Sequence, residues 1–388
     1  MYEIYLDTAS TTKPVDSILN AIKPYIESYW HNPSSLYNNG AKVREDIEAV
    51  RNDIANLINA KPEEIYFTSG ATEANNWVIR GYNEQSCYTA DIFATPIEHK
   101  SIINVLENCN LRPCVEYIRI NNEGVVDLNW LKQEIEWKCD IGIPLLTSII
   151  AANNEIGTVQ DLKKISDIVH SNNGDTIFHT DATQMLPYMP IDVEEMGIDM
   201  LSASAQKLGG LKGTGFLYIR DRIKDHIAPL IYGEQEQGMR GGTENVVGII
   251  AMGEAIKHIN YDNSNLIHMR DVFICELEKI GCKLIGSREN RLPNNISVML
   301  PEGCGGEEML YLLDMSMIEI STGSACNSHL KESSHVLKAI GLSDEESARV
   351  IRISLSNDIK PAEAQKVLEE IKKCIKLLGG NMDNVRIS

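Results

Sequence analysis

The chain is poor in basic residues. Its 388 residues include 36 Lys and Arg against 55 Asp and Glu, which gives a formal net charge of −19. Proteins that bind nucleic acid without sequence preference, or that adsorb to anionic membranes, depend on basic patches. We therefore expect no direct nucleic-acid partner and no membrane partner.

Paired cysteines and long apolar runs are also absent from the sequence. Its nine cysteines are odd in number and form no CxxC pair, a spacing that fits neither a disulfide framework nor a zinc site. The longest apolar stretch, residues 141–152, contains Pro144 and is shorter than the roughly 20 residues of a membrane helix. The first residues show no basic region followed by an apolar segment, as a secretory signal requires. We expect free thiols, no metal and a cytoplasmic location.

The first two thirds of the chain alternate short apolar runs with amphipathic stretches. This alternation is typical of an α/β domain with a mostly parallel sheet sandwiched by helices, here with seven strands. Helices are expected at residues 41–58 and 161–171, where apolar residues recur at helical spacing. The predicted strands are residues 64–68, 92–95, 115–118, 145–151, 176–179, 200–202 and 215–219.

The pattern changes after about residue 255. A helical stretch at 247–259 leads into a polar segment, two separated strands at 295–299 and 350–354, and a helix at 361–378. This order predicts a smaller α+β domain. We therefore expect a large domain of residues 13–256, and a small domain formed by residues 1–12 and 257–388.

A strand, a turn of small polar residues and a helix follow one another between Phe67 and Asn76. Free N–H groups and the positive dipole end of such a helix suit a phosphate, and the Thr72 hydroxyl adds a donor. The alternative is that these residues only form the turn that connects the strand to the helix. The turn is not a GxGxxG loop, which disfavours a dinucleotide-dependent oxidoreductase.

Lys207 stands where an apolar strand meets the glycine-rich turn at residues 209–215. A lysine whose pKa is depressed by burial can attack an aldehyde such as that of pyridoxal 5'-phosphate (PLP), although most lysines are solvated surface charges. Asp181 ends a predicted buried strand, where a carboxylate needs a cation such as a protonated pyridine nitrogen. Capping of the following turn is the alternative for Asp181.

Other polar side chains follow strand ends or loops. His99 comes after the strand at 92–95, where open α/β sheets bind ligands, but a lone histidine is more often structural. The amide of Asn154 could donate to a phenolate or a carboxylate, or could simply form a turn. Arg352, in a predicted strand, needs an anion such as a substrate carboxylate. Cys326 stands among small polar residues, as an accessible thiol must, and the loop at 238–245 could bind an anion or be a plain loop.

Taken in order, these segments closely resemble the PLP-dependent cysteine desulfurases of the NifS/IscS type, in the class V aminotransferase group of PLP fold type I. The resemblance extends from about Tyr5 to about Ser356. The segments that carry it are residues 69–73, 98–100, 153–157 and 181–184, Lys207, residues 240–243 and residues 324–326.

The resemblance implies a role for each matching position. Lys207 would hold PLP covalently and move the substrate α-proton, and His99 would stack on the cofactor ring. Cys326 would attack the substrate sulfur, and Thr243 would reach the phosphate from the other subunit of a homodimer. The remaining assignments are Asp181 to the pyridine nitrogen; Asn154 and Gln184 to the phenolic oxygen; Gly70, Ala71, Thr72, Ser204 and Gln206 to the phosphate; and Asn32, Asn154 and Arg352 to the substrate.

The implied activity converts L-cysteine to L-alanine and passes sulfur, as a persulfide on Cys326, to acceptor proteins of iron–sulfur cluster assembly or tRNA thiolation. A selenocysteine lyase, an aminotransferase or a non-catalytic sulfur-relay scaffold are the alternatives. The chain departs from the family pattern at Gln206, where histidine is usual, and at Leu211, where proline is usual. Glu234 and Gln237 replace a glycine and an arginine, which affects the pocket on the dimer side.

Overall fold

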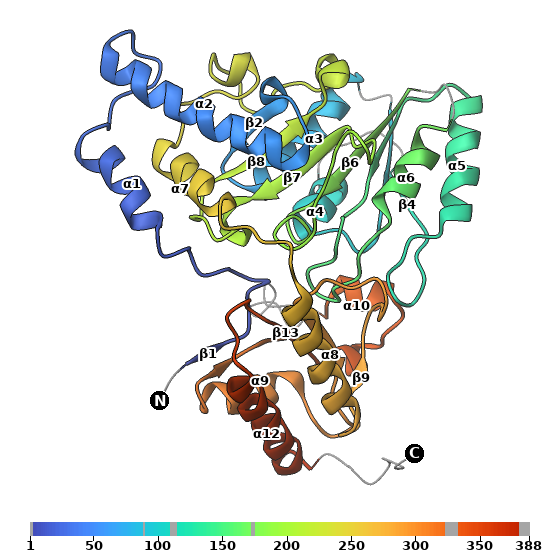
Figure 1. Cartoon of the computed structure of the whole chain (residues 1–388). Helices are drawn as coiled ribbons and strands as arrows, with labels where there is room; N and C mark the ends of the chain where they lie inside the picture. The colour runs from blue at the N-terminus through green and yellow to red at the C-terminus, as the bar shows by residue number, and fades with distance from the viewer. Residues whose placement is uncertain (1–2, 88–89, 109–114, 172–174, 323–332, 380–388) are drawn as a thin grey trace.

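The computed structural model describes residues 3–87, 90–108, 115–171, 175–322 and 333–379, and Figure 1 shows them arranged in two lobes. The larger lobe is built on a sheet of seven strands. Helices lie on both faces of this sheet, and both chain ends lie toward the smaller lobe. In the described part of the chain, no helix has the length and apolar character needed to cross a bilayer.

The large sheet confirms the predicted fold class. In spatial order its strands are β2 (Ile65–Thr68), β8 (Gly215–Ile219), β7 (Met200–Ser204), β6 (Thr176–Asp181), β5 (Leu145–Ser148), β3 (Asp91–Ala94) and β4 (Val115–Tyr117). Only β8 runs antiparallel to its neighbours. The carboxyl ends of the parallel strands therefore share one edge of the sheet, where ligands bind in open α/β folds.

Side chains alternate between two cores, as the period of two along a strand requires. Phe67 and Phe178 face one core, whereas Tyr66 and Ile177 face the other. The first core receives α2 (Asn38–Ile58), α5 (Leu128–Asp140), α6 (Leu162–Val169) and α7 (Val246–Ile256), and the second receives α3 (Ala71–Gln85) and α4 (Lys100–Asn108). A further helix, α1 (Ile18–Glu27), packs on α7 through Ile18, Ile22 and Ala251.

The smaller lobe holds a four-stranded antiparallel sheet. Its order is β12 (Ser321–Thr322), β13 (Val350–Ser354), β10 (Asn295–Met299) and β9 (Lys283–Leu284). Near the N-terminus, β1 (Ile4–Tyr5) pairs in parallel with β11 (Ile318–Glu319). This pairing supports a small domain of residues 1–12 and 257–388, which stays a prediction. The helices after α7 are α8 (Ser264–Glu278), α9 (Gly306–Asp314), α10 (His335–Ala339), α11 (Asp344–Ser347) and α12 (Pro361–Leu377).

Five strands of the large sheet differ in length from the prediction, most of all β5, β6 and β7. The strand predicted at 145–151 ends as β5 at Ser148, although Ile149 N and Ala151 N still donate to carbonyls of β6 over 3.0 Å each. The chain thus stays beside β6 after the regular ladder ends. The strand predicted at 200–202 continues to Ser204, because β8 pairs with it as far as Gly215. The described residues also form four short 3-10 helices: η1 (Pro62–Glu64), η2 (Ala205–Lys207), η3 (Asp221–His226) and η4 (Glu236–Gly238).

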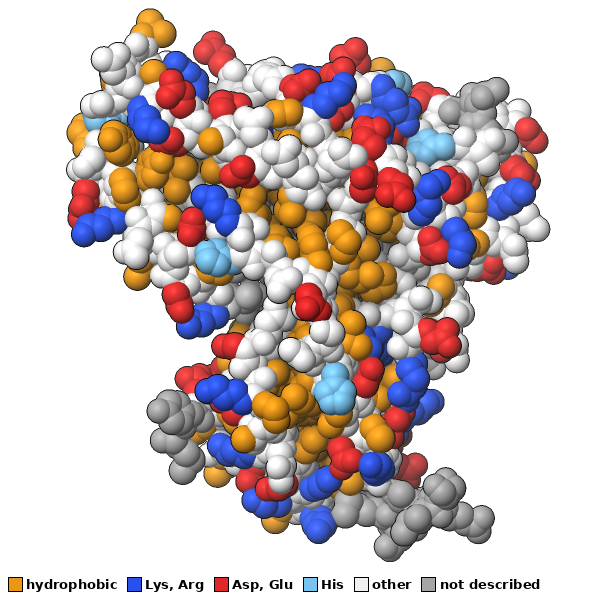
Figure 2. All heavy atoms as spheres, in the orientation of Figure 1, with side chains coloured by type: hydrophobic (Ala, Val, Ile, Leu, Met, Phe, Trp, Pro, Cys, Tyr) orange, Lys and Arg blue, Asp and Glu red, His pale blue; other side chains and the backbone are white. Residues whose placement is uncertain are grey.

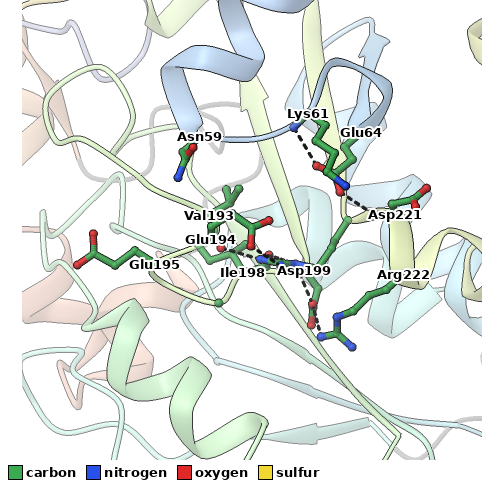
Figure 3. Close-up of polar contacts among 12 residues, drawn as sticks. Asn59, Lys61, Glu64, Val193, Glu194, Glu195, Ile198, Asp199, Asp221 and Arg222 are labelled. Carbon is green, nitrogen blue, oxygen red and sulfur yellow. Dashed lines mark hydrogen bonds and ion pairs between the residues drawn. The ribbon is translucent and has the colours of Figure 1, made fainter.

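A charged cluster fixes the beginning of β7, at the end opposite Ser204. Asp199 is fully buried and accepts from the backbone N–H of Phe178 over 3.0 Å. His170 Nε2 lies 2.8 Å from the same carboxylate, and Arg222 donates to its other oxygen, a contact drawn in Figure 3. The cluster thereby fixes the register of β7 against β6 at the edge of the sheet opposite the carboxyl ends of the parallel strands.

Candidate active site

A cavity of about 450 Å³ opens at the carboxyl edge of the large sheet, beside the smaller lobe. Its walls come from the ends of β6 and β7, the start of α3, the segment after β5, and Arg352 of β13. Eleven of the sequence-predicted residues line it: Gly70, Ala71, Thr72, His99, Asn154, Asp181, Gln184, Ser204, Gln206, Lys207 and Arg352.

One end of the cavity is the N-terminus of α3. Its N-cap is Gly70, with φ +145°, which has no side chain to cap the helix. A Cβ on neighbouring Gly215 would lie 2.7 Å from the Gly70 Cα. The turn and β8 therefore leave no room for a side chain at position 215. Glu73 braces this turn, since it accepts from Ser69 N over 2.8 Å and from Arg240 Nε over 2.9 Å. Uncapped helical N–H groups beside a hydroxyl residue suit a phosphate.

The Lys207 ammonium reaches the cavity from η2, directly after β7. It donates to the carbonyl of Ala9 over 2.7 Å and to that of Ser10. The Gln184 amide donates to the same Ala9 carbonyl over 2.9 Å. The N-terminal segment therefore forms a wall of the site, which the sequence reasoning missed because no local pattern marks Ala9 or Ser10.

Asp181 ends β6 inside the cavity, and its side chain is held from two directions. Its Oδ1 accepts from Thr183 N over 3.0 Å, and its Oδ2 accepts from Asn75 Nδ2 over 2.7 Å. Asn75 belongs to α3 and is fully buried. Sequence reasoning gave Asn75 no role, although its place one helical turn after Ala71 was a signal that it faces the same site.

His99 lies directly before α4 and presents its ring to the cavity. Burial lowers the pKa of its imidazole, and the nearby ammonium groups of Lys207 and Lys100 lower it further, against the attraction of Asp181. The ring is therefore neutral at physiological pH. A neutral ring can stack on a cationic heterocycle without like-charge repulsion.

Arg352 has a protein anion as its partner. Its Nη2 donates to Asp7 Oδ1 over 2.7 Å and to Ser10 Oγ over 2.9 Å, and its Nη1 donates to the Asn154 carbonyl over 3.0 Å. Its Nε is buried and has no hydrogen-bond partner among the described residues. The guanidinium is thus held in place at the cavity wall, and its Nε–H and one Nη1–H are left without a partner among the described residues.

Glu155, next to Asn154, also lines the cavity. Its carboxylate accepts from the Ser334 hydroxyl at the start of α10. Burial raises the pKa of Glu155 to about 7, against the opposing effects of Ser334, Arg352 and Lys100. Sequence reasoning assigned this carboxyl no function, because a glutamate inside an Asn-rich turn looks like an ordinary surface charge.

Three predicted residues are not among the cavity-lining set of the described chain. Asn32 is exposed between α1 and α2, where its side chain accepts from Ser34 N over 2.8 Å. Thr243 is exposed in the loop before α7, and Cys326 lies outside the described residues. In the described ranges, no group of three or more His, Cys, Asp and Glu side chains could hold a metal ion.

Comparisons with known proteins match nearly the whole chain. The family model "Aminotransferase class-V" matches residues 4–367. Cysteine desulfurase IscS of Dictyoglomus turgidum is 39% identical, over 97% of this chain and 95% of the relative. Cysteine desulfurase IscS 1 of Archaeoglobus fulgidus is 38% identical, over 96% and 97% of the two chains.

Solved structures agree with these matches. A NifS-like protein superposes with a TM-score of 0.88 at 31% identity, covering 97% of this chain and 100% of that one. A structure described as SspA in complex with cysteine has a TM-score of 0.79 at 32% identity, over 91% and 98% of the two chains. The sequence resemblance is thereby confirmed, and the chain belongs to the class V aminotransferase family.

Proposed function

We propose that this protein is a PLP-dependent cysteine desulfurase that converts L-cysteine to L-alanine and carries the sulfur away as a persulfide. The observation that carries the proposal is one cavity in which a lysine, a buried aspartate and an uncapped helix N-terminus converge. These are the groups that an aldehyde, a ring nitrogen and a phosphate each require. Full-length similarity to proteins named cysteine desulfurase selects this activity within the family.

The cavity residues fit the cofactor. The phosphate would lie at Gly70, Ala71 and Thr72, where the glycine N-cap leaves room beside the Ser204 side chain, with Gln206 close by. Asp181 would hold the ring nitrogen protonated, Asn154 and Gln184 would face the phenolic oxygen, and His99 would stack on the ring. PLP, when bound, supplies an electron sink that weakens the bonds around the substrate α-carbon.

The side chains of the protein would do the remaining work. Lys207, freed from the cofactor, would accept and return the proton at the substrate α-carbon, while Arg352 and Asn32 would hold its carboxylate. The Cys326 thiol would then attack the substrate sulfur. The C–S bond breaks, an S–S bond forms on Cys326, and the electron pair of the broken bond stays on the β-carbon, which takes up a proton.

A homodimer is part of the proposal. Large apolar side chains of α1 and of the segment between α1 and α2 are solvent-exposed, with Trp30 70% and Leu36 97% accessible. Figure 2 shows apolar side chains gathered over this corner of the large lobe. Patches of this kind on a soluble fold mark a protein interface. Dimerisation through this patch would allow Thr243 of one protomer to contact the phosphate bound in the other protomer.

Acceptor proteins and location complete the proposed function. The persulfide would pass to an iron–sulfur scaffold or to a tRNA-thiolation enzyme. We place the reaction in the cytoplasm, because the nine cysteines of the sequence are odd in number and scattered, a pattern that suits a reducing compartment.

The direct test incubates the PLP-loaded protein with L-cysteine in two parallel reactions, one with a thiol reductant to measure alanine and sulfide, and one without it to measure the mass of the peptide carrying Cys326. Equal amounts of alanine and sulfide are expected with the reductant, and a persulfide on that peptide is expected without it. Lys207→Ala should abolish both products and the cofactor absorption. Cys326→Ala should abolish sulfide release while leaving the absorption intact, and a fully active Cys326→Ala protein would refute the sulfur-transfer step.

A further inference from the structure

A chain of hydrogen bonds connects Asp181 to His99 through two residues that have no assigned role. Asn75 Nδ2 donates to Asp181 Oδ2 over 2.7 Å and to Ser101 Oγ over 2.9 Å. Ser101 Oγ lies 2.7 Å from His99 Nδ1. These three hydrogen bonds lie beneath the surface of the cavity, because Asn75 is fully buried and Ser101 is 8% exposed.

The direction of each bond follows from which groups carry hydrogens. The backbone N–H of Ser101 points at His99 Nδ1 over 3.2 Å, and an amide N–H can only donate. His99 Nδ1 must therefore be an acceptor, so the single proton of the neutral ring is on Nε2. The Ser101 hydroxyl must likewise give its only proton to Nδ1, which leaves its oxygen free to accept from Asn75.

The charge of Asp181 fixes the other end of the chain. Both Asp181 oxygens accept hydrogen bonds, one from Thr183 N and one from Asn75. A reversed Asn75 amide would place its carbonyl oxygen against a carboxylate and lose two donors, which is costly in a buried site. The carboxylate therefore orients the amide and the amide orients the hydroxyl. The hydroxyl then joins the backbone N–H of Ser101 in keeping Nδ1 as the acceptor.

We propose that Asn75 and Ser101 are positioning residues through which Asp181 holds His99 in the tautomer that carries its proton on Nε2. The side of His99 away from Ser101 then presents an N–H donor, and the ring is held against rotation. The catalytic meaning of this arrangement rests on the proposed function, because it prepares a neutral ring beside the place where the cofactor ring would lie. The tautomer itself is a property of the protein alone.

The test uses apo-protein labelled with ¹⁵N-histidine and two-bond ¹H–¹⁵N correlations, with the His99 signals identified by their absence in His99→Gln. In the wild type, Nδ1 is expected to resonate as an unprotonated nitrogen and Nε2 as a protonated one. Ser101→Ala leaves only the 3.2 Å bond from the Ser101 backbone N–H at Nδ1, and Asn75→Leu removes the donor that orients the Ser101 hydroxyl. Each should therefore admit a population of His99 protonated on Nδ1, whereas Ser101→Thr, which keeps the hydroxyl, should restore the wild-type pattern. The His170 signals should stay unchanged in all of these variants.

Activity provides the second readout. In the PLP-loaded protein, Ser101→Ala should lower kcat for L-cysteine about 10-fold, as is typical when the hydrogen-bond partner that orients a functional histidine is lost, while KM changes little and Ser101→Thr remains active. A wild-type His99 protonated on Nδ1, or unaltered tautomers in both Ser101→Ala and Asn75→Leu, would overturn the proposal. If the tautomers behave as expected and the wild type makes no alanine, the proposed desulfurase function fails and the positioning role stands.

Discussion

Arg352 and Asp7 form an ion pair over 2.7 Å, although 345 positions separate them in the sequence. The Asp7 carboxylate and the Asn154 carbonyl accept hydrogen bonds from the two terminal nitrogens of the guanidinium. The arginine is therefore oriented before any substrate arrives. Preorganised donors lose little conformational freedom on binding, which favours affinity for a carboxylate.

Replacing Arg352 by lysine tests this orientation. Arg352→Lys keeps a positive charge beside Asp7 but removes the planar fork of donors, so KM for L-cysteine should rise by about 10-fold or more. The matched control is Arg349→Lys, because Arg349 donates to the Leu300 carbonyl and does not line the cavity. Steady-state kinetics of the three proteins provide the measurement. An unchanged KM in Arg352→Lys would show that the substrate carboxylate binds elsewhere.

Periodic segments were the predictable part of the fold. The strands at 215–219, 295–299 and 350–354 have the expected bounds, because their apolar β-branched and aromatic residues leave little choice of local structure. The antiparallel direction of β8 was not predicted. It follows from the hairpin with β7, and strand direction is a matter of pairing, which local propensity does not specify.

Within the site, residues at strand ends could be predicted, and residues that act through distant contacts could not. Lys207 and Asp181 follow apolar strands, a local signal that needs no tertiary structure. Asp7 and Ala9 have ordinary sequence surroundings, and only the pairing of the N-terminal segment with β11 and β13 brings them to the cavity. Their roles arise from contacts across most of the chain length.

The buried Asp199 cluster should contribute strongly to stability. Asp199→Asn removes a carboxylate that faces His170, Arg220 and Arg222, and breaking a buried ion pair typically costs about 3 kcal/mol or more. We expect a clear fall in Tm by calorimetry. Glu195→Gln is the control, because Glu195 is exposed and its side chain points away from Asp199 in Figure 3. Similar Tm values for the two variants would contradict the importance of the cluster.

The close approach of Gly215 to the phosphate turn gives a third prediction. A Cβ at Gly215 would lie 2.4 Å from the Ala203 carbonyl and 2.7 Å from Gly70 Cα. Gly215→Ala must push β8 away from the turn, at a cost of about 1–3 kcal/mol, and should weaken PLP binding measured by absorbance titration. Gly253→Ala is the matched control, because its Cβ would lie 2.4 Å from Val50 Cγ2, a comparable clash at a position that does not line the cavity. Wild-type PLP affinity in Gly215→Ala would refute the assigned phosphate position.

Glu98 should make stability depend on pH. It is fully buried, and burial raises its pKa from 4.5 to about 8, although Thr95 and the backbone N–H of Ile150 donate to Oε1. Between these two values the folded state keeps a proton that the unfolded state has lost. Stability should therefore fall as pH rises through this window. Glu155 acts in the same direction, but its window ends near pH 7, where its pKa lies.

In the interval from pH 7 to pH 8.5 the larger contribution therefore comes from Glu98, which should lower stability there by roughly 1 kcal/mol. Glu98→Gln keeps the Oε1 acceptor for Thr95 and Ile150 but cannot ionise, so its Tm should change less across this interval than that of the wild type. Glu63→Gln, at an exposed position, should keep the wild-type pH dependence. Parallel Tm profiles for Glu98→Gln and the wild type would mean that the Glu98 carboxyl is already ionised in the folded protein at pH 7.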